Sequence, residues 1–281
     1  MLQEQKVLKY KGQIVFEKLT MPYFQRIPKL FQKNEACFMF VHKGEFSVRT
    51  PDEFITFKNG KGLLAKCFNY FFETNKTQRA SSDSLEVLGV LLYPSIVEEL
   101  FQFDVSYSTH TVDYNVKQIQ IDGLLSNFKE SINILLDNPE LADEATIKTK
   151  LKEFILLISK TQNAPSHLDF LSAMFKTNAT EFKTTVNNNL YSSLSIEEFA
   201  QLCGMSVSSF KRKFKEIYKA SPKKYLTKMK LLKASEMLSS NDFRISDIAY
   251  DCGYESISTF NRAFKTYFGK SPSDYRLTQI A

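Results

Sequence analysis

Apolar and polar positions alternate through much of the first third of the chain, and this pattern predicts β-strands. From Val7 to about Tyr93, short apolar or alternating runs are separated by turn-forming residues. Pro51-Asp52 and Asn59-Gly60 are dipeptides typical of hairpins, and Lys43-Gly44 also turns the chain. Several short antiparallel strands predict a small β-barrel or jelly roll. The predicted strands are Cys37–His42, Glu45–Thr50, Phe54–Phe57, Leu63–Cys67 and Leu85–Tyr93.

From Pro94 onward the apolar residues take the spacing of helices. Asp122–Leu136 and Glu144–Ser159 are two longer amphipathic segments, and shorter helices are expected at Ser95–Phe101 and about Ser166–Phe175. The apolar stripes of the longer segments are wider than covering one side of a barrel requires, so we expect an αα-hairpin used for dimerisation. The stripes consist of Leu124, Leu125, Phe128, Ile132, Leu135 and Leu136, and of Ile147, Leu151, Phe154, Ile155 and Ile158.

The segment Leu194–Tyr275 contains an internal repeat. Ser195–Gly204 reads SIEEFAQLCG and Arg244–Gly253 reads RISDIAYDCG, with equivalent positions 49 residues apart. Ser195 and Glu198 form an S-x-x-E capping box, and each copy then predicts a short helix, a glycine turn and a second helix. This is the helix-turn-helix pattern, whose second helix enters a DNA major groove. Past the glycine the offset is 50 residues: Ser206, Phe210, Arg212, Phe214, Lys215, Ser221, Pro222 and Tyr225 recur as Ser256, Phe260, Arg262, Phe264, Lys265, Ser271, Pro272 and Tyr275.

At 100° per residue, the second helix of each copy has one apolar and one polar face. Phe210 and Phe214 lie on the apolar face of the first copy, as Phe260 and Phe264 do in the second. The polar faces carry Arg and Asn, which can form paired hydrogen bonds with guanine and adenine, and Lys, which suits phosphate. A single basic helix is equally well explained as a solvated surface, but two copies with equivalent arginines favour DNA reading. The residues expected to contact DNA are Ser208, Lys211, Arg212, Lys215, Ser258, Asn261, Arg262 and Lys265.

Residues from about 180 to 278 resemble the DNA-binding domain of the AraC/XylS family of bacterial transcription regulators. The resemblance is carried by Ala200–Lys215, which reads A-x-x-C-G-M-S-x-S-S-F-K-R-x-F-K, and by Ile248–Arg276, which reads I-A-x-D-C-G-Y-E-S-x-S-x-F-x-R-x-F-K-x-x-F-G-x-S-P-x-x-Y-R. It implies two helix-turn-helix units joined by a linking helix, expected at Pro222–Leu238. Ser208 stands where some relatives carry a larger side chain, which implies weaker selectivity in the first unit. The order of the N-terminal strands is similar to the cupin-like sensory domain of this family, most nearly that of its ExsA-like subgroup.

The charge of the chain supports this interpretation. The net charge of +6 arises entirely from Glu181 onward, where 16 Lys and Arg face 10 Asp and Glu; the first 180 residues hold 21 of each. A basic domain beside a neutral one fits a DNA reader attached to a domain that does not touch DNA. No run of roughly 18 apolar residues and no signal-peptide core occurs, so we expect a cytoplasmic protein without a membrane partner.

The N-terminal region offers little for chemistry. A metal-dependent cupin needs several His and a carboxylate on one ion, and His42 is the single His among the predicted strands, so no metal and no cofactor are expected. Thirteen Phe between Phe16 and Phe103 either fill the core, which is the favoured interpretation, or line a pocket for an apolar effector. The cysteines show no C-x-x-C spacing and fit packed thiols in a reducing compartment. They are Cys37, Cys67, Cys203 and Cys252.

These observations predict an α+β protein in three parts: a cupin-like sensory β domain at 1–93, a helical dimerisation and linker region at 94–176, and a DNA-binding domain at 177–281. The predicted function is a sequence-specific transcription regulator, not an enzyme, whose partners are double-stranded DNA, RNA polymerase, a second copy of the chain and a small-molecule effector or regulatory protein. The effector site, the target promoters and the sign of regulation are left open.

Two alternatives keep the DNA reader but change the role of the protein. A repair enzyme would need an activated cysteine, and neither Cys37 nor Cys67 has a Pro-Cys or cationic setting. An architectural DNA binder would not need the differing outward residues of the two helices.

Overall fold

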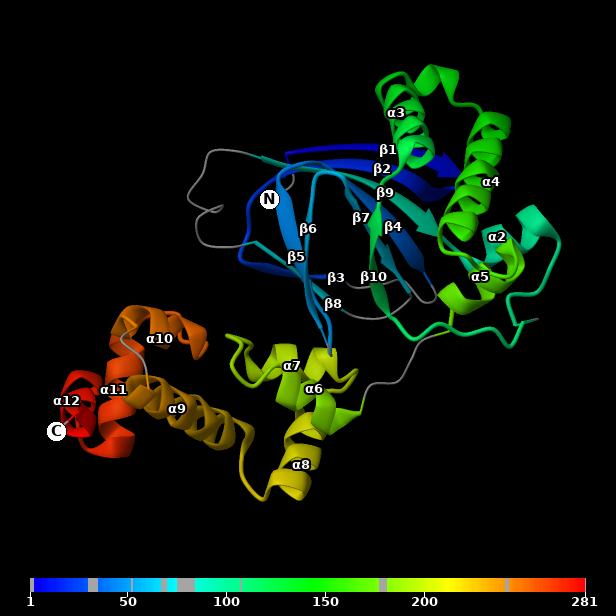
Figure 1. Cartoon of the computed structure of the whole chain (residues 1–281). Coiled ribbons are helices and arrows are strands. Elements are labelled where there is room, and N and C mark those ends of the chain that lie inside the picture. The colour runs from blue at the N-terminus through cyan, green and yellow to red at the C-terminus, as the bar shows by residue number, and fades with distance from the viewer. Residues whose placement is uncertain are drawn as a thin grey trace. The chain divides into compact units, whose positions relative to one another are not determined.

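The computed structural model describes residues 3–29, 35–51, 53–66, 70–74, 84–106, 108–176, 181–240 and 243–280. The chain forms two compact units, Met1–Ala179 and Thr180–Ala281, shown in Figure 1. Their elements confirm the α+β fold class, with antiparallel sheets in the first unit and helices in the second. No helix in the described part of the chain combines the length and the apolar content that crossing a bilayer requires.

The N-terminal unit is built on two antiparallel sheets. A six-stranded sheet has the order β1-β2-β9-β4-β7-β10, and a four-stranded sheet has the order β3-β8-β5-β6. The predicted cupin-like closure of these strands stays a prediction. The strands are β1 (Glu4–Tyr10), β2 (Gln13–Pro22), β3 (Arg26–Lys29), β4 (Ala36–Lys43), β5 (Glu45–Arg49), β6 (Phe54–Lys58), β7 (Lys61–Ala65), β8 (Tyr70–Glu73), β9 (Ser84–Leu92) and β10 (Val116–Gln120).

One of the two predicted hairpins forms and the other does not. Strands β5 and β6 pair on either side of Pro51-Asp52, of which Asp52 lies outside the described residues. Asn59-Gly60 does turn the chain, but β6 belongs to the four-stranded sheet whereas β7 pairs with β4 and β10. The turn at Gly44 likewise leads from one sheet to the other. The dipeptide determines the turn, but the partner of the apolar strand β7 is determined by burial against distant strands.

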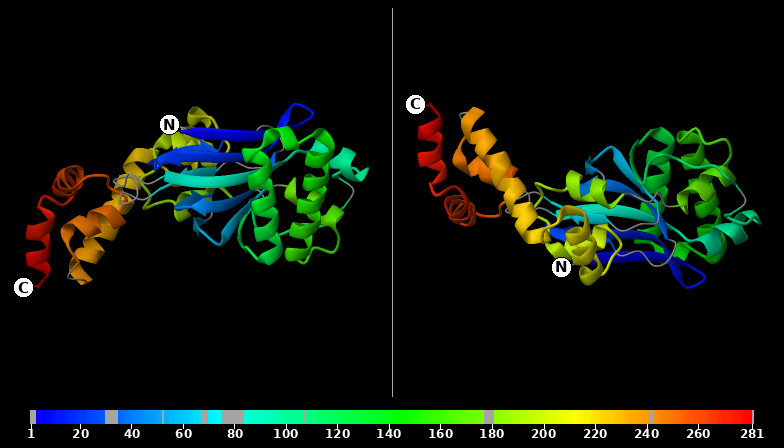
Figure 2. Two further views of the ribbon diagram at one scale, coloured as in Figure 1. Left: turned by 90° about the horizontal axis from the view of Figure 1, so that it is seen from above. Right: turned by 90° about the horizontal axis from the view of Figure 1, so that it is seen from below.

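Two helices cover one face of the six-stranded sheet. Phe128 of α3 (Gly123–Asp137) and Phe154 of α4 (Glu144–Thr161) have ring centres 6.2 Å from Phe16 and 5.3 Å from Phe38, respectively. Figure 2 shows these helices running across the strands. The unit also contains α2 (Pro94–Phe101), the short 3-10 helix η1 (Pro139–Leu141) and α5 (His167–Met174). Since buried residues of α3 and α4 belong to the same core as the strands, much of the predicted stripe is used inside the unit.

The stretch predicted to be helical, 94–176, also contributes a strand. Val116–Gln120 forms β10 and pairs antiparallel with β7 along its whole length. The prediction missed it because its burial is limited to Val116 and Ile119, three residues apart, which gives no alternation.

All regular elements in the described residues of the C-terminal unit are helices, and the unit contains both copies of the predicted repeat. The capping box of Ser195 and Glu198 is formed, and both turn glycines have positive φ, +63° at Gly204 and +75° at Gly253. The linking helix α9 joins the two halves (Figure 1). The helices are α6 (Phe182–Asn188), α7 (Ile196–Leu202), α8 (Val207–Tyr218), α9 (Pro222–Ser240), α10 (Ile245–Asp251), α11 (Ile257–Phe268) and α12 (Pro272–Ile280).

Candidate nucleic-acid interface

Helix α8 is held by its aromatic face. The side chain of Ser206 caps the helix by accepting the backbone N–H of Ser209, an interaction that is worth roughly 1 kcal/mol at helix starts. Phe210 and Phe214 are fully buried, and the ring centre of Phe210 lies 5.4 Å from that of Phe182 on α6. Burial of this face leaves the opposite face of α8 in solvent.

Helix α11 repeats this construction. Ser256 accepts the backbone N–H of Thr259 at the start of the helix. Phe260 and Phe264 are fully buried, and the ring centre of Phe264 lies 5.3 Å from that of Tyr275 on α12. The predicted buried faces of both helices are confirmed.

The side chains expected to contact DNA are all exposed. In the described part of the chain, no acidic side chain lies within 4 Å of the cationic groups on these two faces, so their donors are available to a ligand. The exposed residues are Ser208, Lys211, Arg212 and Lys215 on α8, and Ser258, Asn261, Arg262 and Lys265 on α11.

One exposed apolar residue stands near the start of α11, and the sequence analysis did not single it out. Ile257, directly after the cap of α11, is also exposed. The feature that could have identified Ile257 is an apolar side chain in the first turn of the second helix. An apolar group there can contact the methyl group of thymine.

The linking helix holds parts of both helix-turn-helix units at one junction. Lys230 of α9 donates from Nζ to the carbonyl oxygen of Ser192, ahead of the first unit, and to that of Gly253, in the turn of the second, at 2.5 and 3.1 Å. Lys233 donates to the carbonyl of Asp251 and lies 4.2 Å from the ring centre of Tyr191. We name this contact, formed by residues 191–192, Lys230, Lys233 and the turn 251–254, the junction.

The two turn glycines have different surroundings. A Cβ added to Gly253 would lie 2.3 Å from the carbonyl oxygen of Tyr191 and 2.6 Å from that of Ser192, whereas one added to Gly204 would meet nothing within 4 Å. Glycine at 253 is therefore required by the close packing of the junction as well as by its φ angle.

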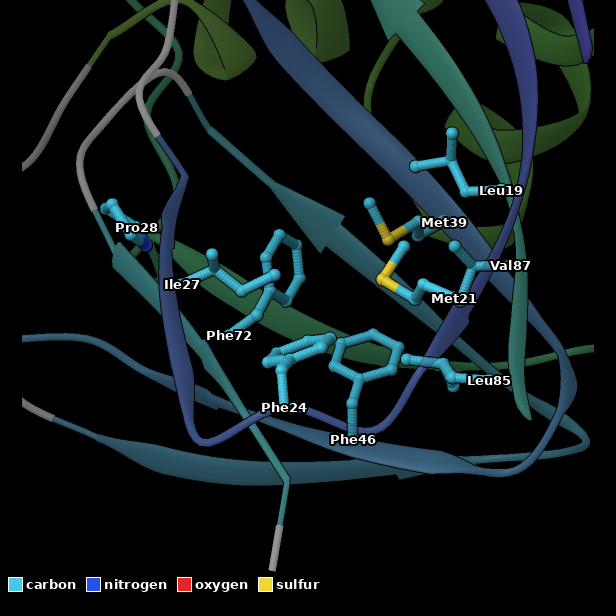
Figure 3. Close-up of a pocket in the computed structure, with 10 residues that line it drawn as sticks. All are labelled: Leu19, Met21, Phe24, Ile27, Pro28, Met39, Phe46, Phe72, Leu85 and Val87. Carbon is cyan, nitrogen blue, oxygen red and sulfur yellow. The ribbon is translucent and has the colours of Figure 1, made fainter. Parts of the chain in front are cut away.

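The N-terminal unit holds an apolar cavity of about 190 Å³ between its two sheets. Figure 3 shows its lining side chains facing one another from the two sheets. Every lining side chain is aliphatic, aromatic or a thioether; they are Leu19, Met21, Phe24, Ile27, Pro28, Met39, Phe46, Phe72, Leu85 and Val87. Three of the thirteen Phe residues, Phe24, Phe46 and Phe72, therefore line this cavity.

The cysteines in the described residues are buried or half-buried and reduced. Burial raises the pKa of the Cys37 thiol to about 11, and also that of Cys203 and Cys252. A nucleophilic cysteine requires the opposite direction. Cys67 lies outside the described residues. Within the ranges that the structure describes, no group of three or more His, Cys, Asp or Glu is placed to hold a metal.

Two helix-turn-helix units with basic recognition helices on one linking helix define a DNA-binding domain of the double helix-turn-helix class. Family models match in two places: a helix-turn-helix domain at residues 199–278 and an ExsA N-terminal regulatory domain at residues 36–170. The chain thus carries an AraC-type helix-turn-helix domain at residues 199–278 and an ExsA-type regulatory domain at residues 36–170.

Similar proteins include the virulence regulon transcriptional activator VirF of Yersinia enterocolitica, 26% identical over 161 residues. This alignment covers 57% of the present chain and 59% of VirF. The transcriptional regulator ExsA of Pseudomonas aeruginosa is 24% identical over 127 residues, which are 45% of this chain and 46% of ExsA. Among solved structures, fatty-acid-bound ToxT of Vibrio cholerae covers 92% of this chain and 93% of its own, at 14% identity and a TM-score of 0.37.

Proposed function

We propose that this chain is a sequence-specific DNA-binding transcription regulator that reads duplex DNA with α8 and α11. The observation that carries the proposal is the pair of equivalent helices. Each is anchored by two buried Phe and presents Arg and Lys that form no ion pair among the described residues. Both helices belong to one compact unit. Readers joined in this way can enter successive major grooves, which are about 34 Å apart on one face of DNA.

Within this surface we assign different tasks to Arg and Lys. Arg212 and Arg262 occupy equivalent, exposed positions, and a planar guanidinium can donate two hydrogen bonds to guanine. Lys215 and Lys265 lie one turn nearer the C-terminal end of each helix, where a point charge suits phosphate. Loss of a base contact should relax selectivity at one position of the site at a cost of about 1–3 kcal/mol, whereas loss of a phosphate contact should weaken binding to all sequences about equally.

A selection on randomised duplexes tests this assignment with Arg212→Ala, Arg262→Ala, Lys215→Ala and Lys265→Ala. The Arg variants should lose preference at separate positions of the selected site. The Lys variants should keep the wild-type preference and lower the slope of log affinity against log salt by about one. Lys58→Ala removes an exposed charge from β6 in the other unit and serves as the control. Retention of the full sequence preference by both Arg variants would refute base reading.

We infer that the N-terminal unit controls DNA binding. A bound small molecule or a regulatory protein would change the fraction of molecules that are able to bind DNA. RNA polymerase at promoters in the cytoplasm is the proposed downstream partner, and the name of VirF favours activation. No catalytic step is proposed, because the buried Cys37 does not fit the activated thiol of a repair enzyme.

We also propose a homodimer formed through α3. Much of the predicted stripe is buried inside the unit, but Leu124 and Ile134 on α3 remain 64% and 56% exposed. Sedimentation of the full chain should show a dimer that Leu124→Asp together with Ile134→Asp converts to monomer. Leu156→Asp, on the solvent side of α4 and 41% exposed, is the control and should leave the dimer intact. A wild-type monomer at micromolar concentration would exclude this interface.

A further inference from the structure

The side chains that point into the space between the two sheets change from apolar to polar or charged within two residues along the strands. Side chains two residues apart on a strand share a face, so the neighbours of the cavity-lining residues point into the same space. We name the five residues Glu17, Lys29, Glu35, Cys37 and Tyr70 the charged layer. On each of four strands, a cavity-lining residue lies two positions from a residue of this layer. The pairs are Leu19 with Glu17 on β2, Met39 with Cys37 on β4, Ile27 with Lys29 on β3, and Phe72 with Tyr70 on β8.

Contacts across the space confirm that this layer lies between the sheets. The Sγ atom of Cys37, on the six-stranded sheet, lies 3.4 Å from the hydroxyl oxygen of Tyr70, on the four-stranded sheet. Lys29 Nζ lies 3.0 Å from Glu35, which immediately precedes β4. Glu17 and Glu35 are 8% and 4% exposed, so both carboxyl groups are largely withdrawn from solvent.

The charges in this layer do not balance. Glu17 and Glu35 bring two carboxyl groups and Lys29 brings one ammonium group, which is paired with Glu35. Among the described residues, the contact of Glu17 is with the neutral amide of Gln5, at 3.2 Å from Nε2 to Oε2. Burial raises the pKa of Glu17, and the charge of Lys29 and the hydrogen bond from Gln5 offset this effect only in part. Glu17 and Glu35 thus share the single ammonium group of Lys29, and a second cation would compensate the remaining buried charge.

The Glu17 side chain packs directly over a glycine, which fixes its position between the sheets. Gly89 on β9 is the register partner of Glu17, and a Cβ added there would lie 3.2 Å from Glu17 Cγ. Every cavity-lining side chain is also without a hydroxyl, amide or charge. A sugar would find no hydrogen-bond partners among those side chains, and a carboxylate ligand would find Lys29 already paired with Glu35.

We propose that the space between the sheets binds an amphipathic cation, with its apolar body in the cavity and its ammonium group beside the carboxylate of Glu17. The cavity of about 190 Å³ exceeds the roughly 150 Å³ apolar cavity that holds benzene in another protein. A phenyl ring with a short alkyl chain is therefore a ligand of suitable size. The regulatory meaning of this site rests on the proposed function, but the binding step does not.

Calorimetry with the full chain tests the proposal with three probes of one shape: phenylbutylamine, phenylbutanol and phenylbutyrate at neutral pH. The amine should bind at least about tenfold more tightly than the alcohol, the effect of one charge-assisted contact, and the carboxylate should bind most weakly. Absence of binding by the amine, equal binding by the three probes or a preference for the alcohol or the carboxylate would overturn the proposal. These outcomes are read on the wild type and do not depend on a variant that folds.

Glu17→Gln keeps the shape of the side chain and removes its charge, so it should abolish the preference for the amine over the alcohol. Glu4→Gln, at an exposed carboxyl group on β1, is the matched control and should keep that preference. A folded Glu17→Gln protein that still prefers the amine would place the ammonium group elsewhere and refute the site. Affinity for duplex DNA is measured separately on the same proteins, so failure of the DNA-reading proposal is distinguishable from failure of the ligand site.

Discussion

The two helix-turn-helix units have the same local construction and different surroundings. In both, a Ser caps the recognition helix, two Phe are buried and a glycine turns the chain at positive φ. The turn of the second unit, however, packs against residues 191–192 and receives a hydrogen bond from Lys230, whereas a Cβ at the turn of the first would meet nothing within 4 Å. Equal motifs therefore support different tasks: the first turn only reverses the chain, and the second also joins the two readers.

The largest effect that follows from this difference concerns the glycines. Gly204→Ala should cost about 1–2 kcal/mol, because the left-handed region disfavours a Cβ. Gly253→Ala should cost an additional ~1–3 kcal/mol, because its Cβ would collide with backbone oxygens that cannot turn away. Denaturant unfolding followed by helical circular dichroism measures both losses. Equal losses for the two variants would show that the junction does not constrain the second turn.

Lys230 should matter more than another lysine on the same helix. Lys230→Met leaves the carbonyls of Ser192 and Gly253 without this donor and should cost about 1.5–3 kcal/mol, the range for hydrogen bonds with a charged group. Lys228→Met removes the same charge from an exposed position of α9 and is the matched control, expected within about 0.5 kcal/mol of wild type.

The same pair of variants sharpens the role of the junction in DNA reading. We consider duplexes that contain both DNA segments contacted by α8 and α11. When one base pair is added or removed between the segments, Lys230→Met should lose less affinity than Lys228→Met does. On duplexes with one segment the two variants should bind alike. If the affinity of Lys230→Met falls as steeply as that of the wild type when base pairs are added or removed, Lys230 contributes to stability and not to the spacing of the two helices.

The smallest expected effect lies at the ends of the recognition helices. Lys219 ends α8 at φ +54°, where the second unit has Gly269 at φ +74°. Lys219→Gly should therefore stabilise the protein by up to about 1 kcal/mol, and Gly269→Lys should destabilise it by a similar amount. Thermal unfolding of the two variants gives the signs. Destabilisation by Lys219→Gly would mean that the side chain or the entropy of the unfolded state outweighs the strain.

The sequence by itself determined the features that depend on neighbours within one helical turn. Ser195 with Glu198, Ser206 and Ser256 mark helix starts because each side chain caps a backbone N–H three residues away. The Phe spacing likewise identified the buried faces of α8 and α11, since 100° per residue is fixed by the geometry of the helix.

Only the tertiary structure decided which distant segments meet. Asn59-Gly60 predicted a turn, but long-range pairing placed β7 beside β4, and β10 joined the sheet from a stretch with helical neighbours. The equivalence of Gly204 and Gly253 in the repeat likewise gave no sign of the junction. Glu17 became a candidate ligand for a cation only when strand pairing buried it between the sheets, near Glu35 and Lys29. Such contacts join residues tens of positions apart, and their energies depend on burial and close packing, which local sequence does not encode.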